Sequence, residues 1–101
     1  MELAKVVGTI VSTMKNQKLT GSKLLLVNLV SPQGAATNTH VVAVDTVGAG
    51  TGEMVLIVRG SSARQAKNME SIPTDTCIIA IVDSLEYKGE TIYQKFDQKE
   101  D

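Results

Sequence analysis

Residues 41–64 read Val-Val-Ala-Val-Asp-Thr-Val-Gly-Ala-Gly-Thr-Gly-Glu-Met-Val-Leu-Ile-Val-Arg-Gly-Ser-Ser-Ala-Arg. Two runs of β-branched and aliphatic residues flank a segment whose glycines are Gly48, Gly50 and Gly52. Glycine has no Cβ, so it permits positive φ and the close approach of another backbone. The stretch therefore predicts a strand, a tight glycine loop, a second strand and the start of a short helix.

The glycine segment lacks the pattern of a phosphate-binding loop. Its spacing is Gly-x-Gly-x-Gly, Glu53 stands where a dinucleotide-binding fingerprint has glycine, and a strand rather than a helix follows. No Lys-Ser or Lys-Thr pair completes a P-loop either. The sequence therefore favours a structural turn, or a contact at a symmetry axis, over a nucleotide site.

The composition indicates one small β-rich domain. The chain has 101 residues, 43% of them hydrophobic, but only one Phe, two Tyr and no Trp. Val, Ile, Leu and Ala carry the apolar content, which favours strands over helices. We predict a single domain at residues 1–95, followed by a charged tail at 96–101.

Charge and the N-terminal sequence argue against two classes of partner. Ten basic and eleven acidic residues, with a pI near 5.8, give no positive field to attract a nucleic-acid backbone. Residues 1–5 lack the basic start of a secretory signal, and no apolar run approaches the roughly 20 residues of a membrane span. We expect a cytoplasmic protein that binds neither nucleic acid nor membrane. Cys77 lies in an apolar run and is expected to be buried.

The hydrophobic pattern predicts a small barrel. Strands are expected at residues 3–14, 23–30, 40–45, 54–59, 77–82 and 91–94. Gly8 suggests a β-bulge in the first strand, residues 35–39 look like an exposed loop, and a hairpin turn at 87–90 precedes the last strand. Residues 62–66 have a capping-box pattern typical of a short helix. The predicted fold is mainly all-β: a small OB-like β-barrel of five to six strands with one short α-helix.

The strands predicted at 23–30, 54–59 and 77–82 are apolar on both faces. Such strands normally belong to sheets that helices cover, yet only one short helix is predicted. A barrel interior hides one face of each strand, and the outward faces would stay wet at a cost near 25 cal/mol per Å² of apolar surface. The sequence therefore predicts a homo-oligomer, most simply a cyclic one, whose subunits cover each other's strands. The hydrophobic pattern does not give the number of subunits.

Two functions from other classes compete with a structural role. An enzyme would need Ser61 or Ser62 as a nucleophile with His40 as its base, but the nucleophile-elbow glycines are absent and no acid is placed to orient the His. One His and one Cys cannot form a metal site without clustered carboxylates, so no metal or other cofactor is expected. An OB-type module that binds single-stranded nucleic acid or a small ligand would need aromatics along a basic groove. The aromatics instead crowd into the C-terminal segment.

Several separate blocks of the chain share one family pattern. Residues 44–56 carry Val-Asp-Thr-Val-Gly-Ala-Gly-x-Gly-Glu-x-Val-Leu, and Gly-Ser-Ser-Ala-Arg follows at 60–64. The segments at 3–13, 73–75 and 79–83 also fit. Together they resemble the EutN/CcmL family, the pentameric vertex proteins of bacterial microcompartment shells. Two segments, Gly-Ala-Gly-Thr-Gly-Glu at 48–53 and Ser-Ser-Ala-Arg-Gln-Ala at 61–66, resemble the ethanolamine-utilisation type more than the carboxysome type.

The resemblance implies a function without catalysis. Hexagonal tiles make flat layers, so a closed polyhedral shell needs fivefold units, and a homopentamer beside hexameric shell proteins would cap those vertices. The candidates for the loop nearest the central axis are Gly48, Ala49, Gly50 and Thr51. The candidates for contacts between subunits or with hexamers are Glu53, Arg59, Ser61, Ser62 and Arg64. For the charged members of this set, the alternative is solvated surface charge that contributes little to stability.

Overall fold

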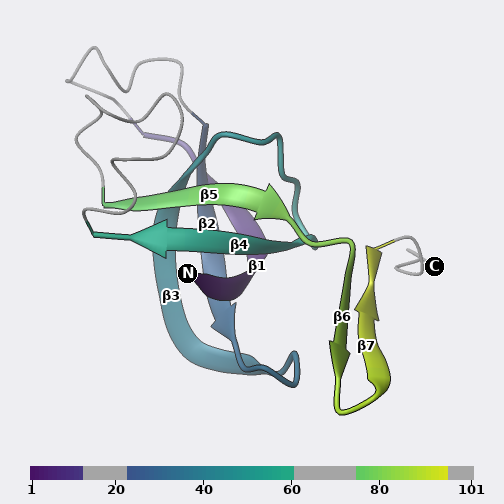
Figure 1. Ribbon diagram of the computed structural model, residues 1–101. Coiled ribbons are helices and arrows are strands. Elements are labelled where there is room, and N and C mark those ends of the chain that lie inside the picture. The colour runs from purple at the N-terminus through teal and green to yellow at the C-terminus, as the bar shows by residue number, and fades with distance from the viewer. Residues whose placement is uncertain (13–22, 61–74, 96–101) are drawn as a thin grey trace.

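The computed structural model describes residues 1–12, 23–60 and 75–95. These residues form seven strands: β1 (Glu2–Ile10), β2 (Lys23–Val30), β3 (Ala36–Asp45), β4 (Met54–Arg59), β5 (Thr76–Ile81), β6 (Ser84–Tyr87) and β7 (Glu90–Gln94). Figure 1 shows β1 to β5 gathered into one body, with β6 and β7 standing at its side. The described residues contain no helix, and the helix predicted at 62–66 lies outside them.

The first five strands form a closed barrel in the order β1-β2-β3-β5-β4. β1 closes the barrel, because it pairs with β2 on one side and with β4 on the other. Neighbouring strands are antiparallel except β3 and β5, which run parallel where Val44 pairs with Cys77 and Asp45 with Ile78. The predicted small five-stranded barrel is confirmed.

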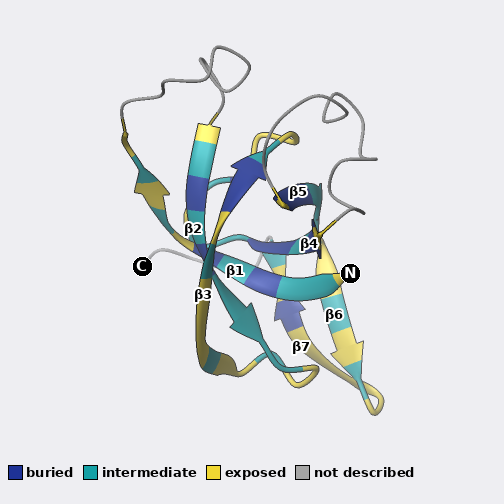
Figure 2. Cartoon of the chain, turned by 90° about the vertical axis from the view of Figure 1, so that its left-hand side faces the viewer, coloured by how far each residue is buried: buried dark blue, intermediate teal, exposed yellow. Residues whose placement is uncertain are grey.

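Aliphatic side chains fill the barrel interior. The buried members of this core are Ala4, Val6, Leu25, Val27, Ala43, Ala49, Val55, Ile57 and Ile78. On the strands they alternate with outward-facing residues, as the two-residue period of a strand requires. Figure 2 shows buried positions on β1, β2, β4 and β5, whereas the first half of β3 is largely exposed.

β1 carries the bulge that the sequence predicts. Its register against β2 shifts between Val6 and Gly8, so that β1 has one extra residue there. Such a bulge bends a strand and increases its twist, which helps a long strand to join two parts of a barrel. β1 ends at Ile10, and Val11 beyond it is 94% exposed. The prediction that this strand continued to residue 14 is therefore wrong.

β3 begins earlier than the sequence predicts, at Ala36 instead of His40. Ala36 pairs with Val30 of β2, and the Thr37 hydroxyl donates a hydrogen bond to the Leu29 carbonyl at 2.7 Å. Because most side chains here are exposed and polar, their pattern is that of a loop, and only the backbone pairing makes the segment a strand. β5 is also displaced, by one residue toward the N-terminus.

β6 and β7 form a separate two-stranded hairpin, whereas the sequence predicted a single sixth strand. The predicted turn at 87–90 is confirmed: Lys88 and Gly89 have φ of 52° and 84°, the left-handed values that a tight two-residue hairpin loop requires. An isolated hairpin is marginally stable in water, so its ties to the barrel matter. The Tyr93 side chain is buried, and its hydroxyl accepts a hydrogen bond from the Met54 amide at 3.1 Å.

Candidate functional site

The glycine loop joins β3 to β4, and Asp45 at the end of β3 organises its first half. The Asp45 Oδ1 accepts hydrogen bonds from the amides of Val47 at 3.0 Å and Gly48 at 3.1 Å. Its Oδ2 accepts one from the Ala49 amide at 3.0 Å. Asp side chains favour turns because they bond to backbone amides a few residues further on in this way. With only 2% of its side chain exposed, Asp45 acts as an internal brace of the loop.

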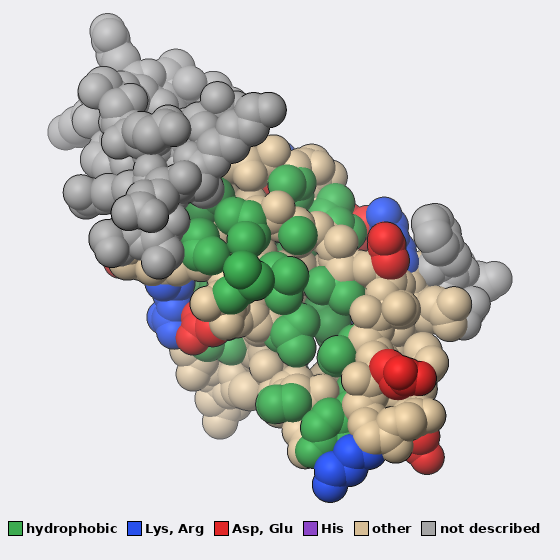
Figure 3. Space-filling model, viewed as in Figure 1, with side chains coloured by type: hydrophobic (Ala, Val, Ile, Leu, Met, Phe, Trp, Pro, Cys, Tyr) green, Lys and Arg blue, Asp and Glu red, His purple; other side chains and the backbone are tan. Residues whose placement is uncertain are grey.

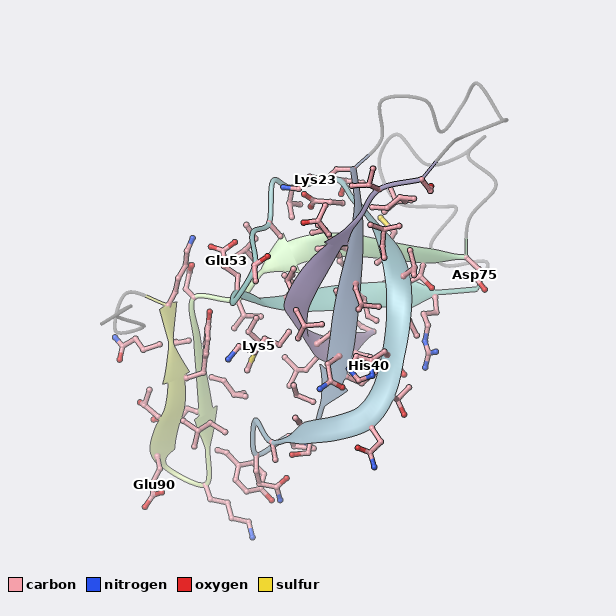
Figure 4. The ribbon with its side chains drawn as sticks, turned by 180° about the vertical axis from the view of Figure 1, so that it is seen from behind. Lys5, Lys23, His40, Glu53, Asp75 and Glu90 are labelled. Atoms are coloured by element: carbon pink, nitrogen blue, oxygen red, sulfur yellow. The ribbon has the colours of Figure 1, made fainter. Side chains whose placement is uncertain are left out.

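Two other strands hold the same half of the loop. The Lys23 Nζ, at the start of β2, donates to the Ala49 carbonyl at 2.8 Å and lies 3.6 Å from the Asp45 Oδ2. The Thr46 hydroxyl donates to the Ile78 carbonyl of β5 at 2.8 Å. Figure 4 shows Lys23 and Glu53 beside the loop at different points along it. The loop is therefore fixed to β2 and β5 as well as to the strands that it joins.

Glu53 organises the second half of the loop. Its Oε1 accepts a hydrogen bond from the Gly50 amide at 2.7 Å, and its Oε2 lies 3.2 Å from the Lys95 Nζ. The Gly52 amide donates to the Val6 carbonyl at 2.8 Å, and the Val6 amide donates to the Glu53 carbonyl at 2.9 Å. The loop thus extends the pairing of β4 along β1.

The four axis-loop candidates have different environments. Ala49 is 0% exposed and belongs to the barrel core, so its methyl group is not available to line an opening. Gly48 and Thr51 are exposed and Gly50 is half-buried. Gly48 has φ of 81°, and a Cβ there would meet nothing within 4 Å in this subunit, so its backbone conformation rather than lack of space requires glycine. The position of the loop at a symmetry axis stays a prediction.

The predicted interface residues that the structure describes are bonded within the subunit. Glu53 bonds to the loop and to Lys95, as above. The Arg59 Nε and Nη2 donate to the Glu2 Oε1 and Oε2 at 2.8 and 2.9 Å. These hydrogen bonds from the guanidinium lower the pKa of the Glu2 carboxyl and raise the pKa of Arg59. Roles for Glu53 and Arg59 between subunits stay predictions, and Ser61, Ser62 and Arg64 lie outside the described residues.

Sequence reasoning missed the residues that hold the loop. Asp45 had a local signal, since an Asp directly before Thr-Val-Gly is typical of a side chain that caps a turn. Lys23 and Lys95 had none, because each is distant in sequence from the loop residue that it binds. The closed barrel brings Lys23 to the loop, and the return of the β6–β7 hairpin to the barrel brings Lys95.

The outer face of the barrel is apolar along β1, β4 and β5. Leu3 pairs with Leu56, and Leu56 pairs with Ala80. All three point outward, because Ala4, Val55 and Ile81, their chain neighbours, belong to or pack against the core. We call Leu3, Leu56 and Ala80 the β4 patch. Figure 3 shows hydrophobic side chains gathered on this face, where β4 and β5 lie in front.

A second group of side chains points away from the barrel interior and is nevertheless buried, as a cluster separate from the barrel core. Val44, Val58 and Cys77 lie side by side on β3, β4 and β5, with Leu24 and Ile79 packed against them. Cys77 is 0% exposed, which confirms the prediction that it is buried. Burial raises the pKa of its thiol, because a buried thiolate would lose its hydration. Cys77 is therefore a packing residue with low reactivity.

The described residues do not assemble a catalytic or metal site. His40 is exposed on β3, where Figure 4 labels it, and its predicted serine partners lie outside the described residues. Within 1–12, 23–60 and 75–95, no group of three or more His, Cys, Asp or Glu side chains could hold a metal ion. A surface hollow at the N-terminus contains one ionisable side chain, Glu2, which Arg59 already binds. The hollow is lined by Met1, Glu2, Leu3, Leu29, Val30, Pro32, Thr37 and Thr39.

Comparison with known proteins assigns this barrel to a family. The family model described as "Ethanolamine utilisation protein EutN/carboxysome" matches residues 1–83. The chain belongs to the EutN/CcmL family. The match includes the whole barrel and the glycine loop, so the blocks that suggested the family are part of one continuous likeness.

Relatives from two kinds of compartment are equally similar to this EutN/CcmL chain. It is 48% identical over 95 residues to the bacterial microcompartment shell vertex protein EutN of Escherichia coli K12, covering 94% of this chain and 100% of that protein. It is 48% identical over 99 residues to the carboxysome shell vertex protein CcmL of Nostoc sp., covering 97% and 98%. The likeness to the ethanolamine-utilisation type agrees with the first of these relatives.

A solved structure adds the assembly state of one relative. The pentameric microcompartment shell protein GrpN of Rhodospirillum rubrum matches with a TM-score of 0.77 and 46% identity, covering 86% of this chain and 99% of that chain. The names of these relatives describe shell proteins rather than enzymes, in agreement with the expectation that this chain is not an enzyme. No helix among the described residues is long and apolar enough to cross a membrane. No observation in the described residues favours the alternative of a nucleic-acid or small-ligand binding module.

Proposed function

We propose that this protein is a homopentameric vertex protein, which caps the fivefold corners of a bacterial microcompartment shell in the cytoplasm. Its neighbours there are hexameric shell proteins of the same compartment. The ethanolamine-utilisation type is the kind of compartment that its loop sequence resembles most.

The observation that carries this proposal is the apolar outer face of the barrel in a chain related to a pentamer. Leu3, Leu56 and Ala80 are half-buried on the outside of a closed barrel whose interior is already filled. Apolar surface in water costs about 25 cal/mol per Å², so a second subunit that covers this face stabilises both. The pentameric state named for the GrpN relative supports association of this fold into a ring of five.

The glycine loop is proposed to lie nearest the fivefold axis. At its tip Gly48, Gly50 and Gly52 have no side chain, which would let the backbones of five loops approach closely, and Val47, which is 38% exposed, adds an apolar side chain before the tip. The charged side chains beside it, Asp45 and Glu53, are bonded within the subunit and do not have to be accommodated between loops. This position supports a narrow opening lined mainly by backbone.

The mass of the purified protein tests the oligomer. Light scattering after size exclusion should return about 54 kDa, since five chains of 10.8 kDa give that mass. A folded species of one chain would contradict the proposal. Electron microscopy of cells that lack the gene tests the role: shells should be elongated or open while the enclosed enzymes stay active. Normal closed shells in such cells would also contradict it.

A further inference from the structure

The barrel has a second outward apolar patch, on the side away from the β4 patch. Leu26 pairs with Val42 on β3, and the bulged residues Val7 and Gly8 of β1 lie opposite Leu26. A Cβ at Gly8 would lie 3.9 Å from the Leu26 Cβ, so both positions face the same way. We call Val7, Leu26 and Val42 the β2 patch.

The exposure of the β2 patch is not explained by one subunit. Val7 is 43% exposed and Val42 is 46% exposed, although both are β-branched residues in the middle of barrel strands. Single exposed apolar residues are ordinary, but three outward apolar residues at adjacent register positions on neighbouring strands indicate an interaction surface. In Figure 1 β4 and β5 lie in front, whereas in Figure 4, seen from behind, β1, β2 and β3 lie in front. The two patches therefore face different directions.

We infer that the β4 patch of one subunit packs on the β2 patch of the next, head to tail around the ring. This inference rests on the proposed homopentamer and specifies which surfaces form it. In a twofold dimer, one patch packs against the same patch of the second subunit. Each subunit would then keep its other patch exposed. A cyclic ring uses two different surfaces of every subunit, and this barrel has two.

The arrangement of the patches is compatible with ring closure. In a closed ring, the two contact surfaces of a subunit incline toward each other on the side of the axis. The shorter way around the barrel from β4 to β2 passes only through β1, and each patch contains one β1 residue. The glycine loop is bonded to β1 at Val6. The second half of the loop therefore lies beside β1, the strand that both patches share, and this agrees with the proposed position of the loop near the axis.

Two complementary variants test the inference. Leu56→Glu places a charge in the β4 patch, and Val42→Glu places one in the β2 patch. Each variant alone should fall from about 54 kDa to the 10.8 kDa of one chain, because every contact in its ring contains one damaged patch. An equal mixture should form a species of two chains, about 22 kDa, since one intact contact remains between the unlike variants. Sedimentation over a concentration series measures these masses.

Controls separate assembly from folding. Val11→Glu introduces the same charge at a side chain that is 94% exposed and outside both patches, and it should keep the mass of the wild type. Ala80→Arg is a second variant in the β4 patch, for use if Leu56→Glu does not give the circular dichroism of the native barrel. A ring that persists in Val42→Glu, or a mixture in which no species of two chains forms, would overturn the inference. The wild type would remain a pentamer in both cases, so the proposed function would stand.

Discussion

Removal of the Asp45 carboxylate should loosen the glycine loop and destabilise the barrel. In Asp45→Ala, the amides of Val47, Gly48 and Ala49 lose their acceptor. Water can replace it at Val47 and Gly48, which are exposed, but Ala49 is 0% exposed. An unsatisfied buried amide costs about 1–3 kcal/mol, and hydrogen bonds to a charged group add to this loss. Since Lys23 is half exposed, its ion pair adds less than about 1 kcal/mol. We expect a total loss of about 3 kcal/mol.

Urea unfolding of wild type and variant measures this loss of stability. Both proteins are compared at the same subunit concentration, because the apparent stability of an oligomer depends on concentration. Asp45→Asn has nearly the same shape but turns a donor toward one of the loop amides, so it should lose most of the same stability. Asp83→Ala removes an exposed carboxylate that makes no side-chain hydrogen bond among the described residues, and it should change stability by less than about 0.5 kcal/mol. A similarly small change for Asp45→Ala would show that the carboxylate does not hold the loop.

Three further outcomes follow from the structure. The hydrogen bonds from Arg59 lower the pKa of the Glu2 carboxyl from 4.5. The ion pair therefore stabilises the folded state fully above pH 4.5, and this stabilisation is lost as the pH falls through the lowered pKa. The difference in urea midpoint between wild type and Glu2→Gln should accordingly vanish in acid. Gly52→Ala should cost about 1–2 kcal/mol of strain at φ 94°, whereas Gly8→Ala, with no positive φ and a nearest neighbour at 3.9 Å, should cost less in thermal unfolding. Cys77 should react with a thiol reagent only after denaturation, because it is buried and its thiol pKa is raised; rapid reaction of the native protein would contradict the packing described.

Sequence analysis placed correctly the strands whose apolar side-chain pattern covers the same residues as their backbone pairing. β2 and β4 have the predicted bounds, since each is an apolar run bounded by polar residues or glycine. The first half of β3 was missed because Thr37, Asn38 and Thr39 have side chains typical of a loop, and their strand state depends on pairing with β2. Pairing partners are a property of the whole fold, which local composition does not encode.

The sequence predicted where the glycine loop lies in the chain, but not which contacts hold the loop in place. The glycines marked the loop, and Gly48 and Gly52 do have positive φ. The sequence did not show that Ala49 faces the core, because it lies in a glycine-rich segment without strand periodicity. It also gave no reason to pair Glu53 with Lys95, whose proximity requires the β6–β7 hairpin to return to the barrel.

The position of β1 between β2 and β4 has a consequence for how the chain folds. Glu2 pairs with Ile57, so the first strand cannot complete its hydrogen bonds until more than half of the chain is available. Such distant pairings make folding slow compared with helical proteins of similar size. Until β1 pairs with β4 and closes the barrel, the facing edges of these two strands are unpaired and prone to aggregate. During synthesis, ring assembly should therefore follow barrel closure rather than assist it.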